Sequence, residues 1–268
     1  MTALALVSRA AAVPPRPRPR FLRVPGQPER EYYLLLPTNL RPGAEPLVLV
    51  HGISRNAPEL VLRFAELANR LGVPLIAPLF RRESFGQYQQ VIDPRGGQRS
   101  DLALLDILDD ASSRFGLSAR QVALFGFSGG AQFAHRFALL HADRVRTCVP
   151  VSAGWYTMPD PELAWPLGLA QSPLPIHPRA QSIPFHVIVG QRERDDDDAL
   201  RRNPALDALQ GENRRARARN WHRALRKAGW SRASSLTVLP RTRHNFSCAH
   251  RNGLIETVFR LIGHQGIE

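Results

Sequence analysis

The chain has 268 residues, which is long enough for a single large α/β domain with a sizeable buried core. Its hydrophobic content of 43% is ordinary for a globular protein, and no apolar stretch approaches the roughly 18 residues that a membrane-spanning helix needs. Two cysteines without a C-x-x-C pair are too few for a disulfide framework. Cys148 lies inside an apolar run, so we expect it to be a small buried side chain.

The formal charge of +13 comes almost entirely from arginine, since Lys227 is the only lysine. A charge of this size predicts attraction to polyanions at low salt. The arginines are not interleaved with aromatic residues, however, and no zinc-finger or RNP-type motif occurs. We therefore expect no specific nucleic-acid partner, although an arginine-rich helical stretch at residues 214–226 leaves a polyanion-binding role open.

The N-terminal segment has the composition of a leader. Residues 14–20 alternate proline with arginine, a pattern typical of extended, solvated chain. We expect residues 1–28 to be a disordered leader and residues 29–268 to form one domain. The first twelve residues lack a basic start and are interrupted by Ser8 and Arg9, so we expect no secretory signal and a cytoplasmic location.

The rest of the chain alternates strand and helix patterns. Residues 31–36 should form an edge strand, because Pro37 ends it. Further strands are expected over residues 47–50, 73–80, 121–127, 146–151, 185–189 and 234–239. Helices are expected over residues 58–71, 100–115, 131–141, 198–228 and 254–262. This order implies an α/β fold, with a mostly parallel sheet and helices on both faces. Residues 156–184 contain seven prolines and are expected to form a lid-like insertion over the site.

One short motif carries the strongest chemical signal. Residues 126–130, Gly-Phe-Ser-Gly-Gly, fit the pattern G-x-S-x-G with Ser128 at its centre. The motif follows a predicted strand and precedes a predicted helix, the context in which a sharp turn lifts one serine hydroxyl to the carboxyl edge of a sheet. Ser128 is therefore the candidate nucleophile, and an ordinary glycine-rich turn is the alternative.

A serine hydroxyl needs a nearby base to act as a nucleophile at neutral pH. His244 is the candidate base, because it lies five residues after the last predicted strand. His250 is the second choice, at the start of the final helical region. Cys248 follows His244 by four residues and is expected to line the pocket at most.

The acid that orients the base should follow the strand over residues 185–189. Glu193 and Asp195 lie three and five residues after Gly190, and both could turn toward His244. We favour Glu193, with Asp195 kept as the alternative. The run of aspartates over 195–198 also fits a solvated helix start.

Backbone N–H groups should stabilise the oxyanion that forms during acyl transfer. Gly129, directly after the serine, and Ile53, in the loop after residues 47–50, are the candidate donors. His51 is expected to tie that loop down. Trp155 and Tyr156 border the insertion and are expected to bind substrate, with packing under the insertion as the alternative.

Residues 126–130, the loop His51-Gly52-Ile53 and His244 together resemble the α/β-hydrolase superfamily over roughly residues 30 to 265. The order of serine, acid and histidine along the chain also matches that superfamily. The segment 51–56 and the stretch from Val189 onward look like the polyhydroxybutyrate-depolymerase and feruloyl-esterase-like group. That group usually has aspartate where this chain has Glu193, and this departure keeps Asp195 open.

The resemblance implies a serine hydrolase that cleaves a small or polymeric carboxylic ester through an acyl-enzyme. It implies no metal and no organic cofactor, and neither an H-E-x-x-H motif nor a Rossmann glycine pattern occurs. The same triad would also serve an amide or thioester hydrolase. A non-catalytic binding protein with this fold is the remaining alternative.

Overall fold

An eight-stranded sheet forms the centre of the molecule, with strand order β1-β2-β4-β3-β5-β6-β7-β8. The computed structural model describes residues 17–264 except 196 and 198. Strands β3 to β8 run parallel, while β2 is antiparallel to both β1 and β4. The strands are β1 (Arg20–Val24), β2 (Gln27–Leu35), β3 (Leu47–Val50), β4 (Leu75–Leu79), β5 (Val122–Phe127), β6 (Val145–Val151), β7 (His186–Gly190) and β8 (Ser235–Leu239).

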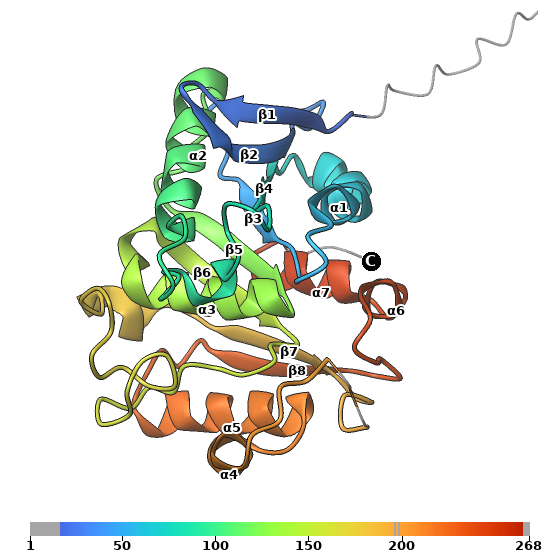
Figure 1. Ribbon diagram of the computed structural model, residues 1–268. Helices are drawn as coiled ribbons and strands as arrows, with labels where there is room; N and C mark the ends of the chain where they lie inside the picture. The colour runs from blue at the N-terminus through green and yellow to red at the C-terminus, as the bar shows by residue number, and fades with distance from the viewer. Residues whose placement is uncertain (1–16, 196, 198, 265–268) are drawn as a thin grey trace, which may run out of the picture.

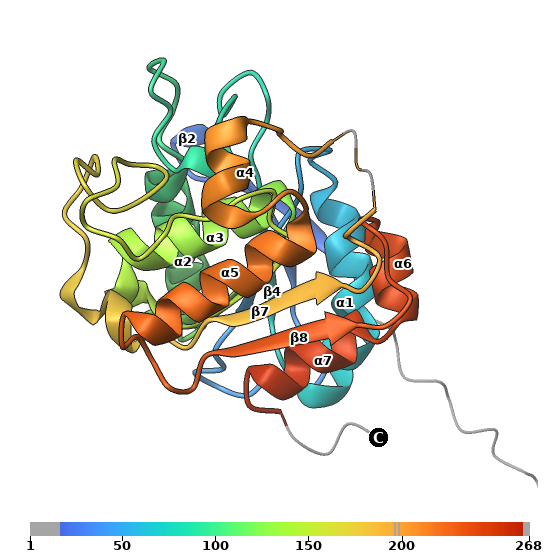
Figure 2. The ribbon, with the colours of Figure 1, turned by 90° about the horizontal axis from the view of Figure 1, so that it is seen from below.

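Helices cover both faces of this sheet (Figures 1 and 2). The α-helices are α1 (Ala57–Leu71), α2 (Ser100–Phe115), α3 (Gly129–Leu140), α4 (Pro204–Gln210), α5 (Arg214–Lys227), α6 (Phe246–Arg251) and α7 (Leu254–Leu261). Helices α2, α3 and α5 pack on one face, and α1 and α7 pack on the other. The predicted α/β class, with a mostly parallel sheet between two helical layers, is confirmed.

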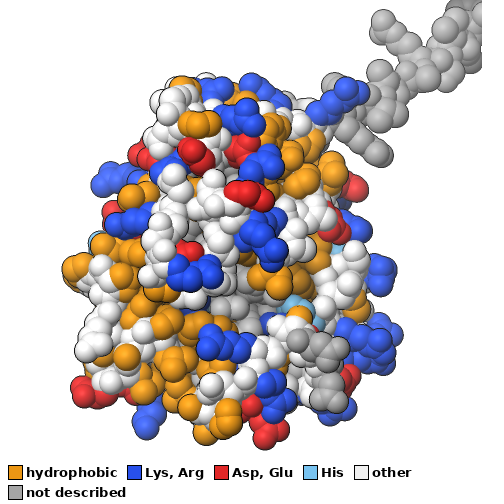
Figure 3. Space-filling model, in the orientation of Figure 1, with side chains coloured by type: hydrophobic (Ala, Val, Ile, Leu, Met, Phe, Trp, Pro, Cys, Tyr) orange, Lys and Arg blue, Asp and Glu red, His pale blue; other side chains and the backbone are white. Residues whose placement is uncertain are grey.

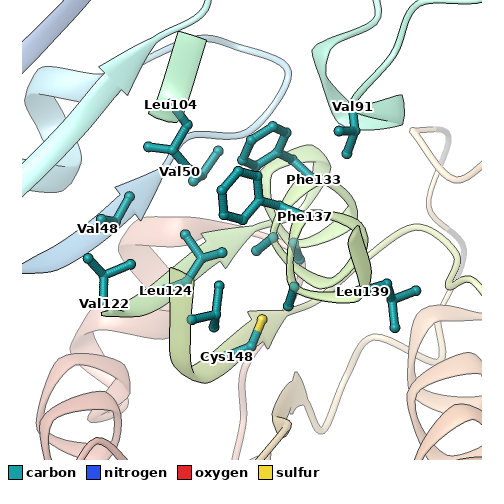
Figure 4. Close-up of a cluster of buried hydrophobic side chains, with 14 of the residues drawn as sticks. Val48, Val50, Val91, Leu104, Val122, Leu124, Phe133, Phe137, Leu139 and Cys148 are labelled. Carbon is teal, nitrogen blue, oxygen red and sulfur yellow. The ribbon is translucent and has the colours of Figure 1, made fainter. Parts of the chain in front are cut away.

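The larger of the two hydrophobic clusters lies between the sheet and α3. Phe133 and Phe137 of α3 face the strand side chains Val48 and Leu124 (Figure 4). Cys148 of β6 is fully buried in the same cluster, which confirms its prediction as a small core residue. Its burial raises the pKa of its thiol well above the ordinary value. This packing fixes α3, and therefore the residue that precedes it, against the sheet.

The N-terminal hairpin differs from the sequence prediction. We predicted that the leader is disordered as far as residue 28, and this is wrong for residues 20–28. In the structure β1 pairs with β2, and Gly26, with φ +74°, closes the turn between them. The prolines that suggested disorder precede this strand, and Phe21 of β1 packs on Tyr33 of β2. Strand β2 is consequently not at the edge of the sheet, since β1 takes that place. Residues 1–16 of the predicted leader lie outside the described residues.

The arginine-rich region also differs from its prediction. The single helix expected over residues 198–228 is two helices, because Gly211, with φ +107°, separates α4 from α5. Two arginines of the predicted cationic face point inward: Arg214 pairs with Asp197, and Arg217 pairs with Asp207. Helix α6 was not predicted at all, and it begins at an Asn245 cap after the loop that carries His244.

The proline-rich segment over residues 156–184 is irregular apart from a 3₁₀ turn at Pro178–Ser182. It lies beside α3, where the N–H of His177 donates to the carbonyl of Leu139 at 3.0 Å. Several of its apolar side chains are packed in the larger cluster. None of its residues lines the cavity that holds Ser128, so the segment flanks the site and does not roof it.

Candidate active site

Ser128 stands on the sharp turn between β5 and α3. Its φ of +56° is one that non-glycine residues rarely adopt, and such strain is typical of a nucleophile elbow. The turn is possible because two flanking positions have no side chain. A Cβ at Gly126 would lie 2.1 Å from the Gly130 carbonyl oxygen, and a Cβ at Gly130 would lie 2.2 Å from the Val50 carbonyl oxygen. The glycines of the motif are therefore required by close backbone contacts, as the sequence suggested.

His244 meets Ser128 from the loop between β8 and α6. Its Nε2 lies 3.0 Å from the Ser128 Oγ, within hydrogen-bonding distance. Its ring stacks on Phe127, with centroids 5.4 Å apart and an angle of 11° between the planes. The second-choice histidine, His250, lies in α6, and its Nδ1 is 3.3 Å from the Arg63 guanidinium. The structure thus brings the first-choice histidine to the serine.

Glu193 completes a chain of three side chains. Its Oε2 lies 3.3 Å from the Nδ1 of His244. Its Oε1 accepts hydrogen bonds from the Ser152 hydroxyl at 2.5 Å and from the Gly190 N–H at 3.0 Å. The Glu193 side chain is almost completely buried, whereas Asp195 is exposed and pairs with Arg194 at 3.8 Å. Of the two candidate acids, only Glu193 contacts the histidine.

Two residues that position this acid were missed by the sequence analysis. Ser152 follows β6 with a φ of +54°, which turns its hydroxyl toward Glu193. Gly190 ends β7, and a Cβ there would lie 2.4 Å from the carbonyl oxygen of Thr242, in the loop that carries His244. Both residues stand at the carboxyl ends of parallel strands, the edge at which polar groups of such sheets converge. Their positions directly after predicted strands are the sequence signal that could have identified them.

Two backbone N–H groups face the serine from different elements. The N–H of Gly129 opens α3, and a Cβ at Gly129 would lie 3.4 Å from the Ile53 nitrogen, so the two segments are adjacent. Within the described part of the chain, neither N–H has a hydrogen-bond acceptor. The pair is therefore available to a ligand oxygen, and the N-terminus of α3 favours negative charge there.

The loop that carries Ile53 is held by His51. The His51 Nε2 accepts from the Phe80 N–H at 3.1 Å, and its Nδ1 lies 2.8 Å from the Gly52 carbonyl oxygen. This arrangement requires a neutral ring with the proton on Nδ1. Burial lowers the pKa of His51 to about 4, so the ring stays neutral at physiological pH. The structure confirms that His51 ties down the loop.

A cavity of about 600 Å³ opens in front of Ser128. Figure 3 shows a hollow at the centre of one face, with Lys or Arg side chains around it. Trp155 lines the cavity, but Tyr156 does not: it is fully buried and stacks on Trp221 at 4.5 Å. Of the two residues predicted to bind substrate, Trp155 lies at the cavity, whereas Tyr156 packs in the core. Cys248 is not among the lining residues.

The cavity wall combines apolar surface with many polar side chains. Its amide side chains come from three connecting segments, after β3, β4 and β8, and from the first turn of α3: Asn56, Gln87, Gln89, Gln90, Asn245 and Gln132. Three charged side chains, Glu59, Arg201 and Arg214, share the wall with these amides. Burial acts to raise the pKa of the Asp197 carboxyl, but its hydrogen bond to Arg214 brings that pKa below the ordinary value. Asp197 and Arg214 thus form a neutralised pair under one side of the cavity.

No protein-family model and no curated protein sequence matches this chain. Among solved structures, the chain is similar to poly(aspartic acid) hydrolase-1 from Sphingomonas sp. KT-1, with a TM-score of 0.77 and 23% identity over 91% of this chain and 99% of that one. It is similar to a poly(3-hydroxybutyrate) depolymerase from Bordetella parapertussis, with a TM-score of 0.73 and 22% identity over 89% and 86%. A fluorophosphonate-binding serine hydrolase from Staphylococcus aureus gives a TM-score of 0.58 and 15% identity over 92% and 98%.

The chain has the α/β-hydrolase fold. In this fold the nucleophile, acid and histidine follow one another along the chain, and Ser128, Glu193 and His244 have that order. Among the described residues, no helix has the length and apolar character to span a membrane. No three histidine, cysteine or carboxylate side chains gather as a metal site in that part of the chain.

Proposed function

We propose that this protein is a serine hydrolase that cleaves carboxylic esters through an acyl-enzyme on Ser128. One observation carries the proposal: Ser128, His244 and Glu193 form a continuous chain of contacts, at 3.0 and 3.3 Å, at the wall of a 600 Å³ cavity. Nucleophile, base and orienting acid in this arrangement are what acyl transfer requires.

In this mechanism the Ser128 Oγ attacks the acyl carbon while the His244 Nε2 takes the hydroxyl proton. Glu193 accepts from the Nδ1–H of His244, which keeps Nε2 unprotonated in the resting enzyme and stabilises the imidazolium that forms. The proton then passes from Nε2 to the departing alcohol. Water repeats the sequence on the acyl-enzyme, releases the acid and restores Ser128.

The negative charge that develops on the acyl oxygen needs donors that are already in place. We assign this role to the N–H groups of Gly129 and Ile53, which have no other acceptor among the described residues. The hydrogen bonds of His51 fix the Ile53 loop, so this donor is rigid before substrate arrives.

Ester hydrolysis is supported by the depolymerase and by a ferulic acid esterase among the structures of similar fold. The same three groups can attack an amide or a thioester, so amide hydrolysis is the second candidate reaction. The cytoplasmic location and the lack of a specific nucleic-acid partner stay predictions.

The proposal is tested with p-nitrophenyl esters of increasing acyl length. Ser128→Ala should abolish turnover and covalent labelling by a fluorophosphonate. Ser118→Ala, which removes an exposed serine hydroxyl away from the cavity, should match the wild type. A wild type that shows neither turnover nor an adduct on Ser128 would favour the non-catalytic binding protein.

A further inference from the structure

The charged side chains of the cavity wall are not equivalent. Glu59 is neutralised, since its carboxylate lies 3.4 Å from the Arg63 guanidinium and accepts from Asn56 at 2.6 Å. Arg214 is neutralised by its ion pair with Asp197, whose atoms are 2.6 Å apart. Arg201 is exposed, and no carboxylate pairs with its guanidinium in the described part of the chain. Among the described residues of the wall, Arg201 is therefore the one charged side chain without an oppositely charged partner.

The backbone at Arg201 is anchored although its side chain is exposed. The carbonyl of Arg201 accepts a hydrogen bond from the Arg217 guanidinium at 2.9 Å. Arg217 is itself fully buried and pairs with Asp207 at 2.6 Å. The preceding residue, Leu200, is buried. An anchored backbone lowers the entropic cost of placing the guanidinium against a ligand.

Two further arginines beside the cavity, Arg55 and Arg136, form no ion pair with a carboxylate among the residues that the structure describes. Arg55 donates to the carbonyls of Phe80, Phe85 and Gly86. Arg136 is fully buried, donates to the Gln89 carbonyl and the Thr157 hydroxyl, and stacks on the cavity residue Trp155 at 4.1 Å. Its Nη2 has no hydrogen-bond partner among residues 17–264, leaving aside 196 and 198.

The charges of the half-buried Arg55 and the buried Arg136 add to the charge at Arg201. Burial lowers the pKa of Arg136 to about 9, which still leaves it protonated at neutral pH. Charges of one sign around a concave, low-dielectric site focus a positive potential into it. The cavity thus favours a ligand that brings its own negative charge.

We propose that the substrate carries a carboxylate group on the portion bound in the cavity, and that Arg201 is the residue that binds this carboxylate. The inference rests on the proposed function, because it names the substrate class of the same site. A guanidinium binds a carboxylate with two parallel, charge-assisted hydrogen bonds. The other polar groups of the wall are mainly neutral amides. The N–H groups of Gly129 and Ile53 are assigned to the reacting oxygen. A single arginine without a carboxylate partner in the described part of the chain therefore suits a monoanion.

The test compares two substrates that differ in one charge. One is the mono-p-nitrophenyl ester of adipic acid, which ends in a carboxylate, and the other is its methyl ester. We expect the wild type to prefer the carboxylate in kcat/KM by about tenfold, the size of a charge-assisted contact in a partly open site. Arg201→Gln should bring this ratio close to one, and Arg201→Lys should keep part of it. Arg226→Gln removes an equal charge from an exposed position on α5 and should keep the wild-type ratio.

The outcomes separate this inference from the proposed function. A wild-type ratio of one or less would overturn the inference while leaving the serine hydrolase intact. So would a ratio that Arg201→Gln lowers no more than Arg226→Gln does, since that result would reflect net charge alone. Release of p-nitrophenol from neither substrate, with no fluorophosphonate adduct on Ser128, would overturn both.

Discussion

Replacing Glu193 with glutamine tests the acid at its point of contact with His244. The two donors on Oε1, Ser152 and Gly190, would keep the amide oxygen in that position. The amide NH₂ would then take the place of Oε2, 3.3 Å from the His244 Nδ1, and donate to it. His244 would have to carry its proton on Nε2, where it faces the Ser128 hydroxyl and cannot accept a proton. We therefore expect a fold close to native and a base in the wrong tautomer.

The expected loss in kcat is about 10³- to 10⁴-fold, which corresponds to about 4 to 5 kcal/mol of transition-state stabilisation. The assay is p-nitrophenyl ester hydrolysis, with thermal unfolding recorded for each variant. Asp195→Asn makes the same carboxylate-to-amide change at an exposed position two residues away and should retain wild-type kcat. Activity of Glu193→Gln within tenfold of the wild type, or a comparable loss in Asp195→Asn, would refute this assignment of the acid.

Three further changes test how the site is held. Ser152→Ala should lower kcat about tenfold with little change in KM, because a hydrogen bond to the charged Glu193 is lost. A change in KM alone would argue against a role of Ser152 in positioning Glu193. Gly130→Ala should lower the free energy of unfolding, measured in urea, by more than about 4 kcal/mol, because the added Cβ would lie 2.2 Å from the Val50 carbonyl oxygen. Near-native stability of this variant would contradict that close contact. His51 should contribute about 2 kcal/mol to a fall in stability between pH 7 and pH 5, because it binds a proton near pH 6.5 when unfolded but only near pH 4 when folded. Burial also lowers the pKa of His135, which adds to the fall, so a flat profile in urea unfolding would contradict the burial of these neutral rings.

The elbow could be read from the sequence because the requirement for it is local. A strand pattern, a serine between glycines and a helix pattern are consecutive, and the close contacts at Gly126 and Gly130 explain why no other residue serves there. The position of His244 followed from the same reasoning, since the carboxyl ends of parallel strands meet at one edge. Local patterns and one topological rule were enough for these residues.

The acid could not be decided in this way. Glu193 and Asp195 are both close in sequence to the end of β7, and only the turn after Gly190 determines which carboxylate is buried. Tyr156 shows the same limit, because an aromatic residue beside a site packs equally well into the core, and here it stacks on Trp221. Strand β1 was missed because the prolines before it dominated the composition of the segment.

Net charge said little about the ligand of this protein. It does not distinguish arginines that bind carbonyl groups inside the protein from arginines that can contact a ligand. Arg136 and Arg217 are fully buried. Arg217 joins backbone carbonyls from separate segments, and Arg136 joins the Gln89 carbonyl to the Thr157 hydroxyl. Arg214 and Arg217 are buried, so only the remaining arginines of α5 contribute to a cationic surface. This weakens the case for a polyanion-binding helix. Arg217 also anchors the backbone at Arg201, so this internal charge helps to place the Arg201 guanidinium at the cavity. We expect retention on heparin to depend on the exposed arginines of α5 and not on Arg201. If Arg201 binds the substrate carboxylate, the preference for an acidic ester should depend on Arg201 and not on those arginines.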